Sequence, residues 1–138
     1  MIPCYVLDAC AVIAFFNDEV GSDAVEDLLD KAVAGHVTLS MGKVNLTEVY
    51  YGLLREYGSA KADAFIDEIE SMPIQIINDI SDDLMQKASH IKVSYKASLA
   101  DSFAVGLSIL LGGSLVTADH HELDAVEKGE AVEFTWIR

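Results

Sequence analysis

The sequence has few basic side chains: nine Lys and Arg stand against 23 Asp and Glu, which gives a net charge of −14. Proteins bind nucleic acid nonspecifically mainly through Lys and Arg side chains that neutralise phosphates. Taken alone, the charge balance therefore argues against a nucleic-acid partner. It also suits a protein that concentrates carboxylates to hold divalent cations, or one whose acidic surface keeps it in solution.

Cysteine and long apolar runs are scarce as well. Cys4 and Cys10 are too few and too close for a disulfide framework, so a reducing cytoplasm is the expected location. No uninterrupted apolar stretch reaches the roughly 18 to 20 residues that a bilayer span needs. No basic segment precedes an apolar one at the N-terminus, so we expect neither a membrane partner nor a secretory signal.

Several well-known motifs are absent. The sequence contains no G-x-x-x-x-G-K-[ST], G-x-G-x-x-G or G-x-S-x-G, so nothing indicates a P-loop, a dinucleotide site or a serine nucleophile elbow. It also contains no linker, repeat or low-complexity tract. With 138 residues and 51% hydrophobic content, we expect a single domain over residues 1–138.

What the sequence does have is a regular alternation of short apolar β-rich segments and helical segments. Strands are predicted at residues 3–8, 36–40, 74–77, 114–119 and 132–137. Helices are predicted at residues 9–17, 22–35, 42–58, 59–72, 81–95, 98–113 and 120–129. This alternation predicts right-handed βαβ units and a parallel sheet in a three-layer α/β/α fold.

Two acidic residues end predicted strands. Asp8 interrupts the apolar run "YVLDACAVIAFF" at the end of the first strand, and Asp119 ends the fourth strand after "SLVTA". Ligands of such sheets bind at the carboxyl ends of the strands. Either residue could instead cap the helix that follows it. Two acids at two strand ends indicate a ligand site more strongly than one.

Two further acids lie on predicted helices. Asp101 is near the start of helix 98–113, where Ser98 is a candidate cap and an acid favours the positive helix end. The same position can also direct a carboxylate toward the strand ends. Glu48 lies beside apolar residues on helix 42–58, and pairing with Arg55 is its alternative role.

Asp8, Glu48, Asp101 and Asp119, in this order, resemble the four acids of a PIN domain. The resemblance covers the whole chain and rests on "YVLDACAV", "NLTEVYYGL", "SLADSFAVGLSILLGGSLVTAD" and the Thr-x-Asp ending of the last segment. A chain of this size is similar to the VapC-type toxin ribonucleases of toxin–antitoxin pairs. Two positions depart from the pattern: Cys10 stands where Ser, Thr or Asn is common, and Leu123 where an aromatic is common.

The resemblance implies a five-stranded parallel sheet with the first and fourth strands adjacent. It also implies a Mg²⁺- or Mn²⁺-dependent endoribonuclease that forms a homodimer and is inhibited by a cognate antitoxin. Asp8, Asp101 and Asp119 are the expected metal ligands, with Glu48 as a ligand or a water-orienting group. Carboxylates repel by about 1 kcal/mol per pair at about 4 Å even in water, and divalent ions relieve that repulsion.

RNA would then be held by local basic groups. The predicted substrate-binding residues are Lys43 and Arg55 on the helix of the second acid, Lys96 ahead of the third, and Thr117. Ordinary surface solvation is the alternative role for the lysines.

Other functions compete with the nuclease. A haloacid-dehalogenase-like phosphatase uses Asp-x-Asp after the first strand, and Cys10 occupies the second position here. A receiver domain needs an Asp at the end of the third strand, where this chain has Asn78-Asp79. A non-catalytic PIN-like module that binds protein is the third alternative, although such a module gains nothing from clustered like charges.

Overall fold

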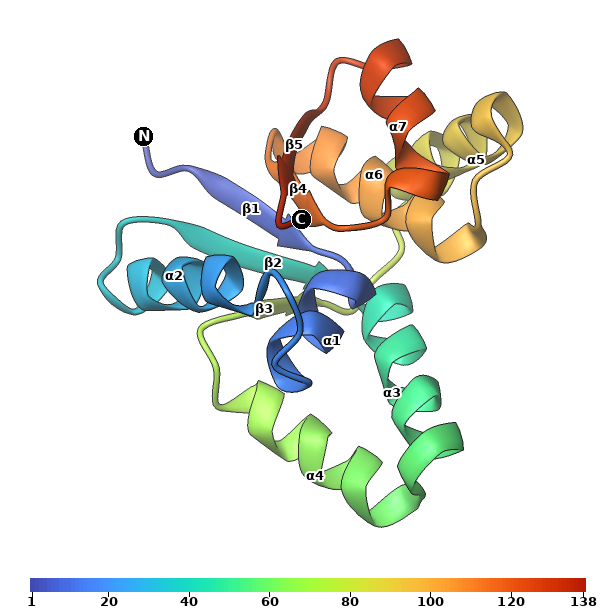
Figure 1. Ribbon diagram of the computed structural model, residues 1–138. Coiled ribbons are helices and arrows are strands. Elements are labelled where there is room, and N and C mark those ends of the chain that lie inside the picture. The colour runs from blue at the N-terminus through green and yellow to red at the C-terminus, as the bar shows by residue number, and fades with distance from the viewer.

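A computed structural model describes residues 1–138 and contains one parallel five-stranded sheet (Figure 1). The strands are β1 (Cys4–Leu7), β2 (Thr38–Gly42), β3 (Gln75–Ile77), β4 (Ser114–Thr117) and β5 (Glu133–Trp136). Their order in the sheet is β3-β2-β1-β4-β5, and every neighbouring pair is parallel. The predicted five-stranded sheet with adjacent first and fourth strands is confirmed.

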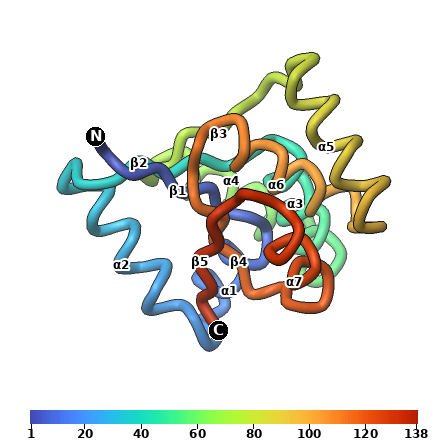
Figure 2. The backbone as a smooth tube through the Cα atoms, turned by 90° about the horizontal axis from the view of Figure 1, so that it is seen from above, coloured from blue at the N-terminus to red at the C-terminus, as the bar shows by residue number.

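Helices cover both faces of this sheet. They are α1 (Ala9–Phe16), α2 (Ser22–Val33), α3 (Lys43–Tyr57), α4 (Ser59–Glu70), α5 (Asp82–Tyr95), α6 (Leu99–Leu111) and α7 (His120–Gly129). Figure 1 shows α5, α6 and α7 together on one side and α1, α2 and α4 on the other. Figure 2 shows α2 and α5 at opposite sides of the molecule with the strands between them. The three-layer α/β/α fold is therefore confirmed.

The central strands are apolar on both faces because each face has its own core. Val6 of β1 and Leu115 of β4 belong to the cluster under α5, α6 and α7. Their neighbours Leu7 and Val116 belong to the cluster under α1 to α4. Successive side chains of a strand point to opposite faces, so both residues of each pair are buried, and β1 and β4 form the centre of the domain.

The strand order reverses between β1 and β4. From β1 the chain proceeds outward through β2 and β3, and it then returns to add β4 and β5 on the other side. In parallel sheets this switch point leaves a crevice at the carboxyl ends of the two strands, where ligands bind. Asp8 follows β1 directly, and Asp119 lies two residues beyond β4.

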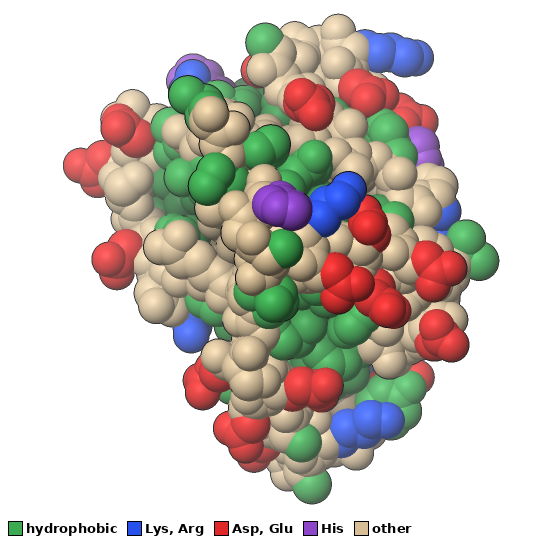
Figure 3. Space-filling view, turned by 90° about the vertical axis from the view of Figure 1, so that its left-hand side faces the viewer, with side chains coloured by type: hydrophobic (Ala, Val, Ile, Leu, Met, Phe, Trp, Pro, Cys, Tyr) green, Lys and Arg blue, Asp and Glu red, His purple; other side chains and the backbone are tan.

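Acidic side chains outnumber basic ones on the face that Figure 3 draws. Figure 3 shows the face near the amino ends of β1 and β2, where acidic side chains are dispersed and basic ones are isolated. None of the seven helices combines the length and the apolar composition needed to cross a membrane.

Candidate functional site

A cleft of about 460 Å³ opens where α1, α3, α6 and α7 meet at the carboxyl ends of β1 and β4. Its acidic lining consists of Glu48, Asp101, Asp119 and Glu122. The remaining lining residues are Ala9, Cys10, Ile13, Tyr51, Gly52, Arg55 and Ser98. Acids from separate segments of the chain therefore surround one opening at the switch point.

Asp8 lies beneath this opening with only 1% of its surface exposed. Its Oδ1 accepts a hydrogen bond from the Ala11 N–H at 2.9 Å and caps α1, so the capping role considered from sequence is real. Its Oδ2 is buried and has no hydrogen-bond partner. Capping thus uses one oxygen of the carboxylate and leaves the other without any structural role.

Burial raises the pKa of Asp8 to about 7, and the nearby carboxylates of Asp119 and Glu48 add to the rise. The Thr117 hydroxyl and the Ala11 N–H offset part of it, although Thr117 makes no well-aligned hydrogen bond to the carboxylate. A desolvated carboxylate with an unpaired oxygen is costly to keep charged. A cation beside Oδ2 would remove that cost.

Asp101 and Asp119 form the second part of the site. Asp101 is 7% exposed, and the Ser98 hydroxyl that caps α6 accepts a hydrogen bond from its N–H at 3.1 Å. Burial raises the pKa of Asp101, and the adjacent Asp119 carboxyl raises it further. The charges of Asp119, Asp8 and Glu48 act in the same direction. The four predicted acids therefore interact electrostatically in one place.

Glu48 approaches from α3, the wall opposite α7. Partial burial raises its pKa, and the charge of Asp119 contributes. The helix is held in position by buried Asn45, whose Nδ2 donates a hydrogen bond at 3.1 Å to the carbonyl of Ala100 on α6. Because Asn45 lies one turn from Glu48 and Ala100 precedes Asp101, this bond ties the two acid-bearing helices together.

Cys10 lines the same cleft, but its thiol is not activated. Burial raises its pKa to about 11, and the charges of Asp8 and Asp119 contribute. Because the thiolate is the nucleophilic form, Cys10 stays protonated at neutral pH.

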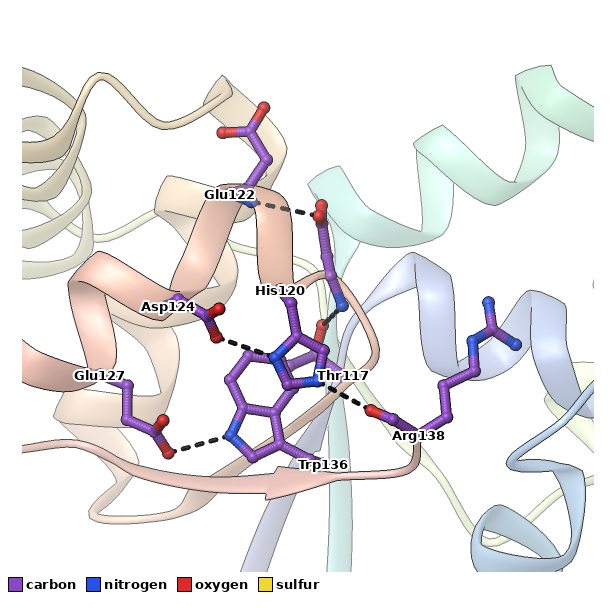
Figure 4. A network of polar contacts seen from close by, with 8 residues as sticks. Thr117, His120, Glu122, Asp124, Glu127, Trp136 and Arg138 are labelled. Carbon is purple, nitrogen blue, oxygen red and sulfur yellow. Dashed lines mark hydrogen bonds and ion pairs between the residues drawn. The ribbon is translucent and has the colours of Figure 1, made fainter.

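A polar network fixes the start of α7 beside Asp119 (Figure 4). Asp119 caps α7 by accepting the Glu122 N–H at 3.2 Å, and its own N–H donates to the Thr117 hydroxyl at 3.1 Å. Both His120 ring nitrogens are bonded, one to Asp124 and one to the carbonyl of Arg138, each at 2.8 Å.

The same histidine stacks on Trp136 of β5, with 3.8 Å between the ring centroids (Figure 4). The Asp124 carboxylate, followed by the Arg138 carbonyl, raises the pKa of His120. The network joins α7 to the end of β5 and so holds the segment that carries Asp119.

The predicted substrate-binding residues are dispersed. Arg55 lines the carboxylate cleft and is the one Lys or Arg that does so. Thr117 is fully buried below it and holds the Asp119 backbone. Lys43 lines a narrow cavity between α3 and α6, and Lys96 lines a surface groove on α5.

Sequence reasoning missed Glu122, Asn45 and Tyr51. The spacing Asp119-x-x-Glu122 is that of a capping box, which could have placed Glu122 near Asp119. No local pattern connects Asn45 to Ala100, 55 residues away.

The donor set suits a hard divalent cation. No three Asp, Glu, His or Cys side chains converge into a closed metal-binding group. Mg²⁺ commonly uses one or two carboxylates and completes its shell with waters and substrate phosphate, so an open acidic cleft is compatible with it. The unpaired Asp8 oxygen and the raised pKa of Asp101 mark oxygens that a cation would stabilise.

These features define an α/β domain whose switch-point cleft is lined with carboxylates. The PIN domain family profile matches residues 5–129, and the chain belongs to the PIN domain family. The resemblance predicted from the four acids is confirmed. No curated protein matches the chain.

Solved structures share this fold at low sequence identity. A chain of DNA-bound VapBC from Salmonella typhimurium aligns with a TM-score of 0.74 at 14% identity, covering 100% of both chains. A chain of promoter-bound VapBC2 from Rickettsia felis gives 0.73 at 17% identity, covering 96% of this chain and 97% of that one. Mycobacterium tuberculosis VapC20, described as a toxin that cleaves the sarcin–ricin loop, gives 0.63 at 17% identity, covering 80% and 86%.

Proposed function

We propose that this protein is a metal-dependent endoribonuclease and the toxin of a toxin–antitoxin pair. The observation that carries the proposal is that Glu48, Asp101 and Asp119 line one switch-point cleft with Asp8 buried beneath it. Membership of the PIN domain family, whose nucleases generally use divalent metal ions, supports it. So does the likeness to chains from VapBC complexes and to VapC20.

Asp8, Asp101 and Asp119 would hold Mg²⁺ or Mn²⁺, with Glu48 as a further ligand or as the group that orients water. Such an ion, when bound, supplies an acidified water and neutralises charge on the phosphate and the leaving oxygen. The products expected of this chemistry carry a 5′-phosphate and a 3′-hydroxyl.

The chain's own groups set the conditions for that chemistry. Burial and the neighbouring carboxylates raise the pKa of Asp101, so this group has to lose its proton before it can act as a ligand. Because its pKa is raised, the Glu48 carboxylate is a stronger base than an exposed one, which suits a group that accepts a proton from water. Arg55 places one positive charge at the rim, where it would contact phosphate.

RNA cleavage in Mn²⁺ or Mg²⁺, with and without EDTA, tests the proposal. Wild-type protein should cleave only with metal, and Asp101→Asn should lower the rate on the order of 100-fold or more because it removes a site carboxylate. Asp67→Asn is the matched control, because Asp67 is exposed on α4 and has no side-chain bond. If the cleavage rate is unchanged both by EDTA and by Asp101→Asn, the proposed metal-dependent nuclease site is refuted. No cleavage of any RNA would favour the non-catalytic binding module.

The antitoxin partner and the homodimer belong to the same proposal. The likeness to chains of toxin–antitoxin complexes supports the first. Exposed apolar side chains on α5 and α6, including Val93 and Leu99, leave apolar surface for a second copy. Light scattering on the purified protein distinguishes a dimer from a monomer. Co-expression with a small gene found next to this one in its genome would test suppression of toxicity.

A further inference from the structure

One face of α3 forms a wall of the cleft and carries more than a carboxylate. Glu48, Tyr51, Gly52 and Arg55 all line the opening. Residues three, four and seven positions apart lie on the same side of a helix. The wall therefore runs from the acidic centre, past an aromatic ring and a glycine, to an arginine at the rim.

Tyr51 is not a core residue. Its side chain is 46% exposed, and the Arg55 guanidinium carbon lies 5.3 Å from the centroid of its ring. A cation over an aromatic face is attracted by the ring's quadrupole, which restrains both side chains. The ring and the guanidinium together form a partly exposed part of the cleft lining beside the carboxylates.

Gly52 has no steric reason to be glycine. It lies inside α3 with ordinary helical backbone, and a Cβ built on it would meet no atom within 4 Å. Glycine in a helix interior destabilises the helix relative to alanine. Its effect here is to leave the wall without a side chain between Glu48 and Arg55.

We propose that Tyr51, Gly52 and Arg55 form a subsite for an unpaired nucleobase of the RNA, next to the cleavage centre. This inference rests on the proposed nuclease function. Proteins recognise single-stranded RNA by stacking its bases on aromatic rings and arginine planes. Stacking does not depend on charge, so it would supply binding that an acidic cleft with one arginine cannot obtain from phosphate contacts.

Each of the three residues has its own role in binding the base. Tyr51 offers the ring on which the base stacks, and Gly52 leaves room for the base. Arg55 lies over one face of that ring, which leaves the other face for the base, and its charge neutralises the phosphate next to that base.

Fluorescence anisotropy with a labelled single-stranded eight-nucleotide oligoadenylate, in Ca²⁺ without Mg²⁺ or Mn²⁺, tests the subsite by binding alone. Tyr51→Ala should weaken binding on the order of 5- to 100-fold, the range for one lost base stack. Tyr51→Phe should restore binding, and Gly52→Val should weaken it because the side chain fills the gap. An abasic ribose-phosphate chain of the same length should bind wild type and Tyr51→Ala equally.

Tyr57→Ala is the matched control. Tyr57 is 43% exposed on the same helix and carries its own cation, Lys61, at 3.9 Å from the ring centroid, but it does not line the cleft. This variant should bind the oligoadenylate like the wild type.

The two proposals fail in different ways. One outcome is that metal-dependent cleavage occurs while Tyr51→Ala and Gly52→Val change neither RNA binding nor KM. That result would refute the proposed base-binding subsite and leave the proposed nuclease function intact. Equal losses from Tyr51→Ala and Tyr57→Ala would also overturn the subsite and favour a protein-binding face on α3. If wild-type protein neither binds nor cleaves RNA, both proposals are overturned.

Discussion

Replacing Asp8 by asparagine should stabilise the metal-free protein at pH 8, the opposite of what loss of a helix cap does. The side-chain oxygen of the introduced asparagine can still accept the Ala11 N–H, since asparagine caps helices as well as aspartate does. What the substitution removes is a buried charge with one unpaired oxygen.

The size of the effect follows from the pKa of Asp8. Burial raises it from 3.8 to about 7, and about three pH units at about 1.4 kcal/mol each amount to roughly 4 kcal/mol. The folded protein keeps this proton where the unfolded chain has released it, so wild-type stability falls as pH rises from about 4 to about 7. The Asp8→Asn gain should therefore grow from near zero at about pH 4 to about 2 to 4 kcal/mol at about pH 8.

Urea denaturation in EDTA at pH 4.5, 6 and 8 measures this gain directly. Asp67→Asn, an exposed replacement of the same chemistry, should change stability by less than about 0.5 kcal/mol at every pH. If Asp8→Asn is destabilising at pH 8, or if its effect does not vary with pH, Asp8 is a structural cap and the reasoning fails.

Three further predictions concern the metal and the helices. Mn²⁺ at about 100 times its Kd should stabilise the wild type by about 2.7 kcal/mol, and the thermal shift should disappear in Asp101→Asn but persist in Asp67→Asn. Metal-dependent cleavage should rise with pH through about 7, because Asp8 must lose its proton to bind a cation; a rate that falls over this range would contradict the ligand role. Asn45→Ala removes the hydrogen bond between α3 and the Ala100 carbonyl, so urea denaturation should show a loss of about 0.5 to 1.5 kcal/mol. Its kcat should fall as well, since Glu48 loses its fixed position relative to Asp101; unchanged kcat and stability would show that this bond does not position α3.

The order and type of the elements could be predicted from local pattern. The alternation of apolar β-rich segments with helices predicts the parallel sheet. Ser81 and Ser98 predict where α5 and α6 begin, because each side chain caps the helix that follows it. Asp8 and Asp119 were identifiable because strand ends in such a sheet share one edge. These features depend on neighbours in the chain, so the sequence by itself determines them.

Tertiary structure alone decided which side chains face the cleft. Arg55 lines it whereas Lys43 and Lys96 lie elsewhere, and Thr117 is buried beneath it. The packing of α3 against α6 brings Glu48 to Asp101 through Asn45, a contact between residues 55 positions apart. Such contacts depend on how both helical layers close over the sheet, which helical and strand periodicity do not encode. The sequence thus determined the acids and their elements, and only the closed fold placed them around one cleft with Tyr51 and Arg55.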